Sequence, residues 1–116
     1  MAKRKVTNLT EVALITCVVQ KGLADTINSS LLEVGVQGST VHMGVGTGVR
    51  ERLGILGVAV DVEREIISVM VPQDQTDRIF ERMFLAGRLD TPGMGYIYVT
   101  PLMQAATYIP PSLMQD

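Results

Sequence analysis

The sequence has no tryptophan and few other aromatic residues, with two Phe and three Tyr among 116 residues. The core must therefore be built from aliphatic side chains, chiefly Val, Ile, Leu and Met. A single cysteine, Cys17, excludes a disulfide within the chain and is typical of a protein from a reducing compartment. Because Cys17 lies in the apolar run Val12–Val19, we expect it to be a small buried hydrophobe rather than a catalytic thiol.

Long apolar runs and a strong net charge are also absent. No segment approaches the roughly 20 apolar residues that span a bilayer, and Val12–Val19 resembles neither a secretory signal nor a membrane anchor. The formal net charge of −2 argues against nucleic acid as a general partner. We therefore expect a cytoplasmic protein.

Residue types suited to catalysis are scarce as well. One histidine, His42, and one cysteine do not suffice for a dedicated zinc or copper site within one chain. We interpret His42 as a hydrogen-bonded strand residue, with a ligand or base role as the alternative. The carboxylates Asp61, Glu63 and Glu65 alternate with other residues as at a solvated strand edge. We therefore expect a protein that is not an enzyme, while an enzyme on the same scaffold stays an open alternative.

The apolar pattern predicts one domain over residues 1–116 with the order β-α-β-β-α-β. Strands are expected at Val12–Gln20, Ser39–Val45, Glu65–Val71 and Tyr96–Thr100, the last two closed by Pro72 and Pro101. Helices are expected at Gly22–Val34, ended by Gly35, and at Asp74–Ala86, with Asp74 as N-cap and Gly87 after the end. Residues 1–10 are expected to be a flexible tail, and residues 102–116 a C-terminal segment with an edge strand or a helical turn at Met103–Tyr108. This order predicts an α+β, ferredoxin-like split βαβ fold, with both helices on one face of an antiparallel sheet.

The predicted strands are apolar on both faces. Along the first strand, one set of residues alternates with a second set of similar character: Ile15, Cys17 and Val19 against Leu14, Thr16 and Val18. Two helices cover only one face of a sheet, so the other face would leave several large apolar side chains in water. We therefore expect an obligate homo-oligomer.

Two glycine-rich segments are the candidates for a ligand site. The first contains Gly44, Gly46 and Gly48 and precedes Arg50 and Arg52; the second is Pro92–Gly95. Exposed backbone N–H groups and arginine side chains suit phosphate, so the candidate anion contacts are Arg50, Arg52, Arg64 and Arg88. The first segment is neither a dinucleotide fingerprint, because its third glycine comes one residue early, nor a P-loop, because no G-K-[ST] follows. A tight exit from the strand is the alternative interpretation.

Several short motifs follow one another in a recognisable order. The first predicted helix ends in Gly35-Val-Gln-Gly-Ser-Thr-Val41, and Gly46-Thr-Gly48 begins six residues after the Thr. The third predicted strand ends in Val69-Met-Val-Pro-Gln-Asp74, and the second glycine segment continues as Gly93-Met-Gly-Tyr-Ile-Tyr-Val99. From about Val12 to Val99, this order and spacing resemble the PII signal-transduction proteins, the nitrogen regulatory protein P-II family.

The resemblance implies a ferredoxin-like homotrimer that binds an adenine nucleotide in the clefts between subunits. The nucleotide-binding positions that it implies are Thr40, Gly46, Gly48, Arg64, Gly93 and Gly95. The glycines would offer backbone N–H groups to phosphates, and Arg64 stands where the family has a Lys. It also implies a regulatory protein that controls a membrane transporter or an enzyme in nitrogen or related metabolism, with no essential cofactor.

The chain departs from the family pattern where phosphates would be held. Tyr96 stands where the family has a Lys, and Thr107 and Ile109 stand where it has two Arg. The partner-binding loop is shortened to about residues 47–60 and contains no Tyr that could be uridylylated. This indicates a divergent PII-like member, whose candidate effectors are ADP, AMP, ATP, cyclic AMP or bicarbonate. The alternative is a trimer of the same fold that binds a metal or another metabolite and no nucleotide.

Overall fold

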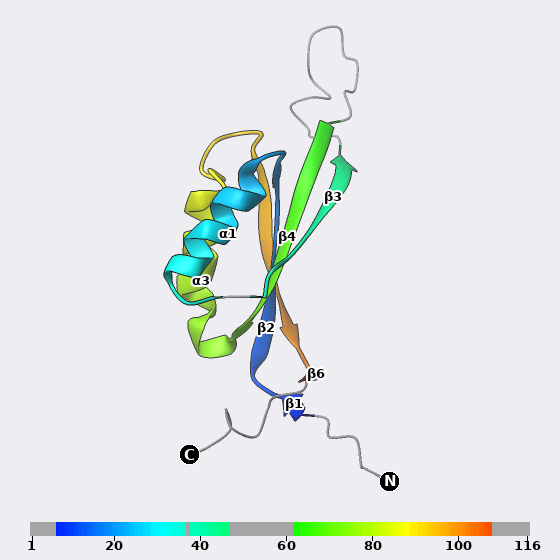
Figure 1. Cartoon of the computed structure of the whole chain (residues 1–116), viewed down its shortest axis with the longest axis vertical. Helices are drawn as coiled ribbons and strands as arrows, with labels where there is room; N and C mark the ends of the chain where they lie inside the picture. Colours follow the sequence, from blue (N-terminus) through cyan, green and yellow to red (C-terminus); the bar gives the residue numbers. More distant parts are fainter. Residues whose placement is uncertain (1–6, 37, 47–61, 108–116) are drawn as a thin grey trace, which may run out of the picture.

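A computed structural model describes residues 7–36, 38–46 and 62–107 of the chain (Figure 1). Its strands are β1 (Thr7–Leu9), β2 (Val12–Gln20), β3 (Thr40–Gly46), β4 (Val62–Pro72), β5 (Gly95–Leu102) and β6 (Ala105–Thr107). Its helices are α1 (Leu23–Glu33) and α3 (Thr76–Ala86), and a 3-10 turn, η2 (Gln73–Gln75), directly precedes α3. The four strands and two helices that the apolar pattern predicts are therefore all present.

The main sheet has the strand order β3-β4-β2-β5, and every neighbouring pair is antiparallel. Because β4 lies between them, β2 and β3 run parallel without touching, and α1 forms the crossover connection. The helices α1 and α3 contact each other and lie on the same face of the sheet (Figure 1). This arrangement confirms the predicted α+β, ferredoxin-like fold.

The core lies between the two helices and the sheet face that they cover. Its buried members are Ile15, Cys17, Val19, Ile27, Leu31, Ile67, Val69, Val71, Ile79 and Met83. No aromatic residue belongs to this set within the described residues, and Phe80 only packs against its margin. Burying each large aliphatic side chain contributes about 1.5–3 kcal/mol, so this face supplies most of the hydrophobic stabilisation within one copy of the chain.

Helix α1 ends as the sequence predicts, with a glycine in the left-handed conformation. Gly35 has a φ of 81°, which a residue with a Cβ adopts only at a cost in free energy. The N–H groups of Gly35 and Val36 donate to the carbonyls of Leu32 (3.1 Å) and Leu31 (2.9 Å). This Schellman motif gives the last carbonyls of the helix hydrogen-bond partners.

Helix α3 ends in the same motif, but an arginine takes the left-handed position. Arg88 has a φ of 57°, and the N–H groups of Arg88 and Leu89 donate to the carbonyls of Leu85 (3.1 Å) and Phe84 (3.0 Å). The preceding Gly87 has an ordinary φ of −82°. The left-handed conformation therefore costs roughly 1 kcal/mol at Arg88.

Gly87 is required for packing rather than for its backbone conformation. A Cβ on this residue would lie 3.1 Å from Val19 Cγ1, 3.2 Å from the Met83 carbonyl oxygen and 3.3 Å from Ile27 Cδ1. The end of α3 therefore approaches β2 and α1 more closely than a larger residue permits.

The beginning of α1 is capped by a side chain from a distant strand. Its N-cap residue, Gly22, has no side chain, and Glu65 of β4 takes over this function. Glu65 Oε1 accepts hydrogen bonds from the backbone N–H groups of Gly22 and Ala24, the second at 3.1 Å. The prediction that Glu65 lies at a solvated strand edge is therefore wrong, because this carboxylate supplies acceptors and negative charge at a helix N-terminus.

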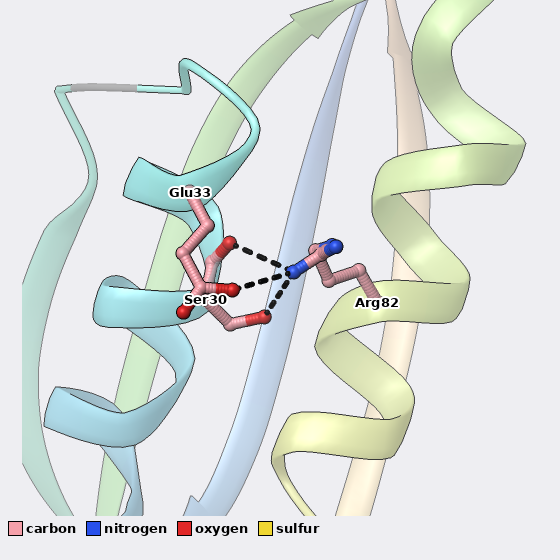
Figure 2. Close-up of polar contacts among 3 residues, drawn as sticks. All are labelled: Ser30, Glu33 and Arg82. Carbon is pink, nitrogen blue, oxygen red and sulfur yellow. Dashed lines mark hydrogen bonds and ion pairs between the residues drawn. The ribbon is translucent and has the colours of Figure 1, made fainter.

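A polar cluster joins the two helices on their outer side (Figure 2). Arg82 Nη1 of α3 donates to the carbonyl oxygen and the hydroxyl of Ser30 at 3.3 and 3.2 Å, and forms an ion pair with Glu33 Oε2 at 3.2 Å. Exposed ion pairs contribute little to stability, so we infer that this cluster mainly orients α1 relative to α3.

Several boundaries differ from those expected. β4 begins at Val62, three residues before the predicted start at Glu65. Thr7–Leu9, placed by prediction in a flexible tail, forms β1 and pairs with β6, a contact between chain ends that local pattern does not reveal. Pro101 does not stop β5, which continues to Leu102; β5 is an edge strand, where a missing N–H is tolerated. Asp74 is not the N-cap of α3, because it lies within η2 and Gln75 occupies that position.

Candidate functional site

The face of the sheet opposite the helices is largely apolar, and neither described helix covers it (Figure 1). Strand alternation places on it Leu14, Thr16 and Val18 of β2, Ile66, Ser68 and Met70 of β4, and Tyr96, Tyr98 and Thr100 of β5. We call this the uncovered face. Within the described parts of the four strands β3, β4, β2 and β5, this face carries no Asp, Glu or Lys, and its strongly basic residue is Arg64.

Thr40 and His42 lie on the uncovered face of β3, the strand at one edge of the sheet, and both are exposed. Gly46 is the last residue of the same strand. A ligand that reached this edge would therefore meet a hydroxyl, an imidazole and glycine backbone.

Arg64 lies in β4 between Gly44 of β3 and Gln20 of β2, and only 7% of its surface is exposed. Burying a guanidinium costs free energy unless its surroundings compensate for the lost water. Its position thus differs from that of a surface cation, and we expect its side chain to be held in one orientation.

The second glycine segment precedes β5, at the opposite edge of the sheet. Gly93 and Gly95 both have positive φ angles, 82° and 138°. A Cβ on Gly95 would lie 1.9 Å from the carbonyl oxygen of Val18, so this turn is fixed against β2. The next residue, Tyr96, is 60% exposed, and its ring stacks on Tyr98 with centroids 6.2 Å apart.

The described parts of the two glycine segments, up to Gly46 and from Pro92 to Gly95, do not meet within one copy of the chain. The end of β3 at Gly46 and the start of β5 at Gly95 lie toward the same end of the sheet, but β4 and β2 separate them. Three strand spacings correspond to roughly 14 Å. A ligand the size of a phosphate group cannot contact both Gly46 and Gly95 of one copy.

The remaining predicted anion contacts are only partly described. Gly48, Arg50 and Arg52 lie outside the described residues. Arg88 is exposed and belongs to the connection between α3 and β5, where its carbonyl accepts a hydrogen bond from the Thr91 N–H at 3.1 Å. Arg88 therefore shares a loop with Gly93 and not with Thr40.

Two features bear on enzymatic chemistry. Burial raises the pKa of the Cys17 thiol to about 12, so Cys17 stays protonated and unreactive at neutral pH, as its predicted role as a buried hydrophobe requires. Among the described residues, no group of three His, Cys, Asp or Glu side chains is placed to hold a metal ion.

Neither described helix is long and apolar enough to cross a membrane.

Sequence reasoning missed two features of the uncovered face. Thr16 Oγ1 and Ser68 Oγ lie 3.4 Å apart in a hydrogen bond at its centre. Tyr96 and Tyr98 form the stacked pair at its β5 edge. Their spacing of two residues on a strand is a signal that would have placed both rings on one face.

Comparison with known proteins identifies the chain. The sequence profile of the family described as Nitrogen regulatory protein P-II matches residues 12–109. Among solved structures, the fold is similar to that of Arabidopsis thaliana PII bound to citrate, with a TM-score of 0.64 and 20% identity over 80% of this chain and 78% of that chain. A search of curated protein sequences finds no match. Proteins of this family are regulatory rather than enzymatic, and are generally trimeric with small effectors and partner proteins as ligands. The chain therefore belongs to the Nitrogen regulatory protein P-II family.

Proposed function

We propose that this protein is a trimeric cytoplasmic regulator that binds a small effector between its subunits and controls a partner transporter or enzyme. The observation that carries the proposal is the position of the two glycine segments at opposite edges of one sheet. An effector whose phosphate contacts both segments would lie between two copies, with the Thr40–Gly48 segment of one copy facing the Gly93–Gly95 loop of another. The apolar uncovered face supports such an assembly.

We propose an adenine nucleotide with few phosphates as the effector. The glycine backbone supplies N–H groups for an anion, Thr40 a hydroxyl, and Arg64 a positive charge. Tyr96 gives the second glycine segment an aromatic ring in place of a charge, which reduces the affinity for a triphosphate. ADP, AMP or cyclic AMP should therefore bind more tightly than ATP.

A carboxylate effector is the second candidate. The observation that favours it is the structurally similar Arabidopsis thaliana PII, whose structure holds citrate. A carboxylate is an anion that backbone N–H groups and arginine also recognise, and it does not require the Lys that Tyr96 replaces.

Calorimetric titration with ATP, ADP, AMP, cyclic AMP and citrate tests both candidates. We expect ADP or AMP to bind the wild type with a Kd below millimolar. Arg64→Met should weaken this binding by about 1.5–3 kcal/mol, roughly tenfold to a hundredfold in Kd, and Arg64→Lys should retain most of it. Thermal melting of each variant checks that the buried substitution has not unfolded the protein.

The outcomes separate the candidates. If no adenine nucleotide binds below millimolar and citrate does, the carboxylate candidate replaces the nucleotide. If ATP binds most tightly and Arg64→Met binds like the wild type, our assignment of charge in the cleft is wrong. Light scattering of the wild type tests the assembly separately, since a folded monomer at micromolar concentration contradicts a site between subunits.

A further inference from the structure

A continuous row of hydroxyl groups crosses the uncovered face of the sheet. The strand register places Thr40 of β3 beside Ser68 of β4, Ser68 beside Thr16 of β2, and Thr16 beside Tyr98 of β5. Each strand thus contributes one hydroxyl-bearing residue at the same level. We call these four residues the hydroxyl row.

The hydroxyl row is flanked by apolar residues on the two central strands. On one side lie Ile66 and Val18, and on the other side lie Met70 and Leu14. Ser68 and Thr16 are therefore the polar pair at the middle of an otherwise apolar surface. Only 5% of the surface of Thr16 is exposed even in a single copy, so its hydroxyl has little access to water.

The central pair cannot satisfy its own hydrogen-bonding capacity. Its bond of 3.4 Å between Thr16 Oγ1 and Ser68 Oγ uses one of the two hydroxyl protons, whichever residue donates. The other proton needs an acceptor outside the pair. Covering the face with purely apolar groups would leave this donor unsatisfied, which is costly in a buried setting.

We propose that the Thr16–Ser68 pair fixes how the copies are aligned when their uncovered faces pack together in the trimer. This inference rests on the trimeric assembly proposed above and names the residues that specify it. When the copies are correctly aligned, an oxygen from another copy accepts the remaining hydroxyl proton of each pair. In another alignment the pair would face apolar side chains like those that flank it, Ile66 and Val18 or Met70 and Leu14.

The physical reason is that apolar contacts alone tolerate sliding, whereas one unsatisfied hydroxyl does not. Apolar side chains of similar size can pack in several alignments at similar free energy. A single buried polar group that is satisfied in only one alignment separates that alignment from the others. Buried polar residues in helical coiled coils specify register and oligomeric state in this way.

The test removes both hydroxyls while preserving volume. The double variant Thr16→Val/Ser68→Ala should keep the far-ultraviolet circular dichroism of the wild type. In native mass spectrometry and light scattering it should lose the single trimer species and distribute over several oligomeric states. If this double variant expresses poorly, Ser68→Ala alone should show the same loss to a smaller extent, because Ser68 is only half-buried.

Two controls isolate the effect of the pair. The exchange variant Thr16→Ser/Ser68→Thr keeps both hydroxyls and should restore the single trimer. Thr100→Val removes a hydroxyl from the same face outside the row and should leave the trimer unchanged. A single trimer of wild-type mass in the hydroxyl-free double variant overturns the proposal. A wild type that is not trimeric overturns the assembly itself, and that result is visible before any variant is made.

Discussion

The two faces of the central sheet carry similar side chains but have different surroundings. On the helix-covered face of β2 and β4, the side chains of Ile15, Cys17 and Ile67 are completely inaccessible to solvent. On the uncovered face of the same strands, Leu14 and Ile66 are only partly buried, and 40% of Met70 is exposed. Within the described residues, one copy of the chain therefore completes one core and has a second apolar surface that the helices do not cover.

This difference separates stabilisation by packing within one copy from stabilisation by packing between copies. The helix-covered face is satisfied by α1 and α3, so its residues stabilise a single copy. The uncovered face gains nothing comparable from the described helices, and under the proposed trimeric assembly its stabilisation would come from other copies. Substitutions on the two faces should accordingly affect folding and assembly separately.

The largest expected effect comes from a charge on the helix-covered face. Val69→Asp places an unpaired carboxylate in the core, which costs several kcal/mol and a large part of the stability of a small domain. We expect no soluble folded protein, as judged by expression and circular dichroism.

The matched change one residue further along β4 should have a different result. Met70→Asp lies on the uncovered face, so we expect a folded protein that runs as a monomer in light scattering. A folded Val69→Asp variant, or an unfolded Met70→Asp variant, would show that the two faces are not separate.

A substitution of Gly95 tests how closely the edge strand β5 is held against β2. Gly95→Ala brings a Cβ within 1.9 Å of the Val18 carbonyl oxygen and is also strained at a φ of 138°. We expect a loss of about 3 kcal/mol or more in the free energy of unfolding, measured by urea denaturation. Gly38→Ala, which is left-handed but meets no atom within 4 Å, should cost only about 1 kcal/mol. Equal losses would mean that β5 moves away from β2 easily.

A substitution of Glu65 tests how much the cap on the N-terminus of α1 contributes to the stability of the helix-covered side of the sheet. Glu65→Ala removes the acceptor of the Gly22 and Ala24 N–H groups and should lower the free energy of unfolding by about 1–2 kcal/mol. Glu63→Ala is the control, because its exposed ion pair with Lys21 at 3.0 Å is worth at most about 1 kcal/mol. If both changes cost the same in urea denaturation, the cap is not a stabilising contact.

Arg88 offers a smaller change of opposite sign. Arg88→Gly relieves the left-handed strain after α3 and should raise the free energy of unfolding by about 0.5–1 kcal/mol. A shift of the thermal midpoint to higher temperature checks this. A lower midpoint would mean that the Arg88 side chain stabilises the fold more than its backbone strains it.

Titration of Cys17 should have no effect on stability at neutral pH, and its effect should appear only at alkaline pH. Its pKa is raised by burial from 9.0 to about 12, so the folded state holds the proton more tightly than the unfolded chain. This contribution is complete below pH 9.0 and is lost as the pH rises toward 12. The urea midpoint of the wild type should therefore fall more than that of Cys17→Val across this range, and parallel curves would contradict it.

Much of the fold could be predicted because its signals are local. The β-branched run of β2 and the spacing of Ile27 and Leu31 depend only on residues a few positions apart. Gly35, which ends α1, was also predictable because a helix commonly ends in a left-handed glycine. By contrast, β1 and β6 are paired over almost the whole length of the described chain, and no local pattern announces such a pairing.

The composition of the candidate site stays a prediction from the sequence, and its geometry could not be predicted. The sequence marks Thr40, Gly46, Gly93 and Gly95 as members of two glycine segments, and the resemblance assigns them to one site. It does not reveal that the segments lie at opposite edges of the sheet, because strand order depends on the pairing of β4 with both β3 and β2. Nor does it reveal that Arg64 is buried.

The sequence by itself determined the four strands of the main sheet, the two helices, the aliphatic core and the presence of apolar residues on both faces of each central strand. Those properties follow from periodicity and composition, which act over a few residues. Only the tertiary structure decided which face the helices cover, that Glu65 caps α1, and that Thr40, Ser68, Thr16 and Tyr98 share one level. Each of these depends on strand register across long separations, and a shift of one residue would move every side chain to the other face.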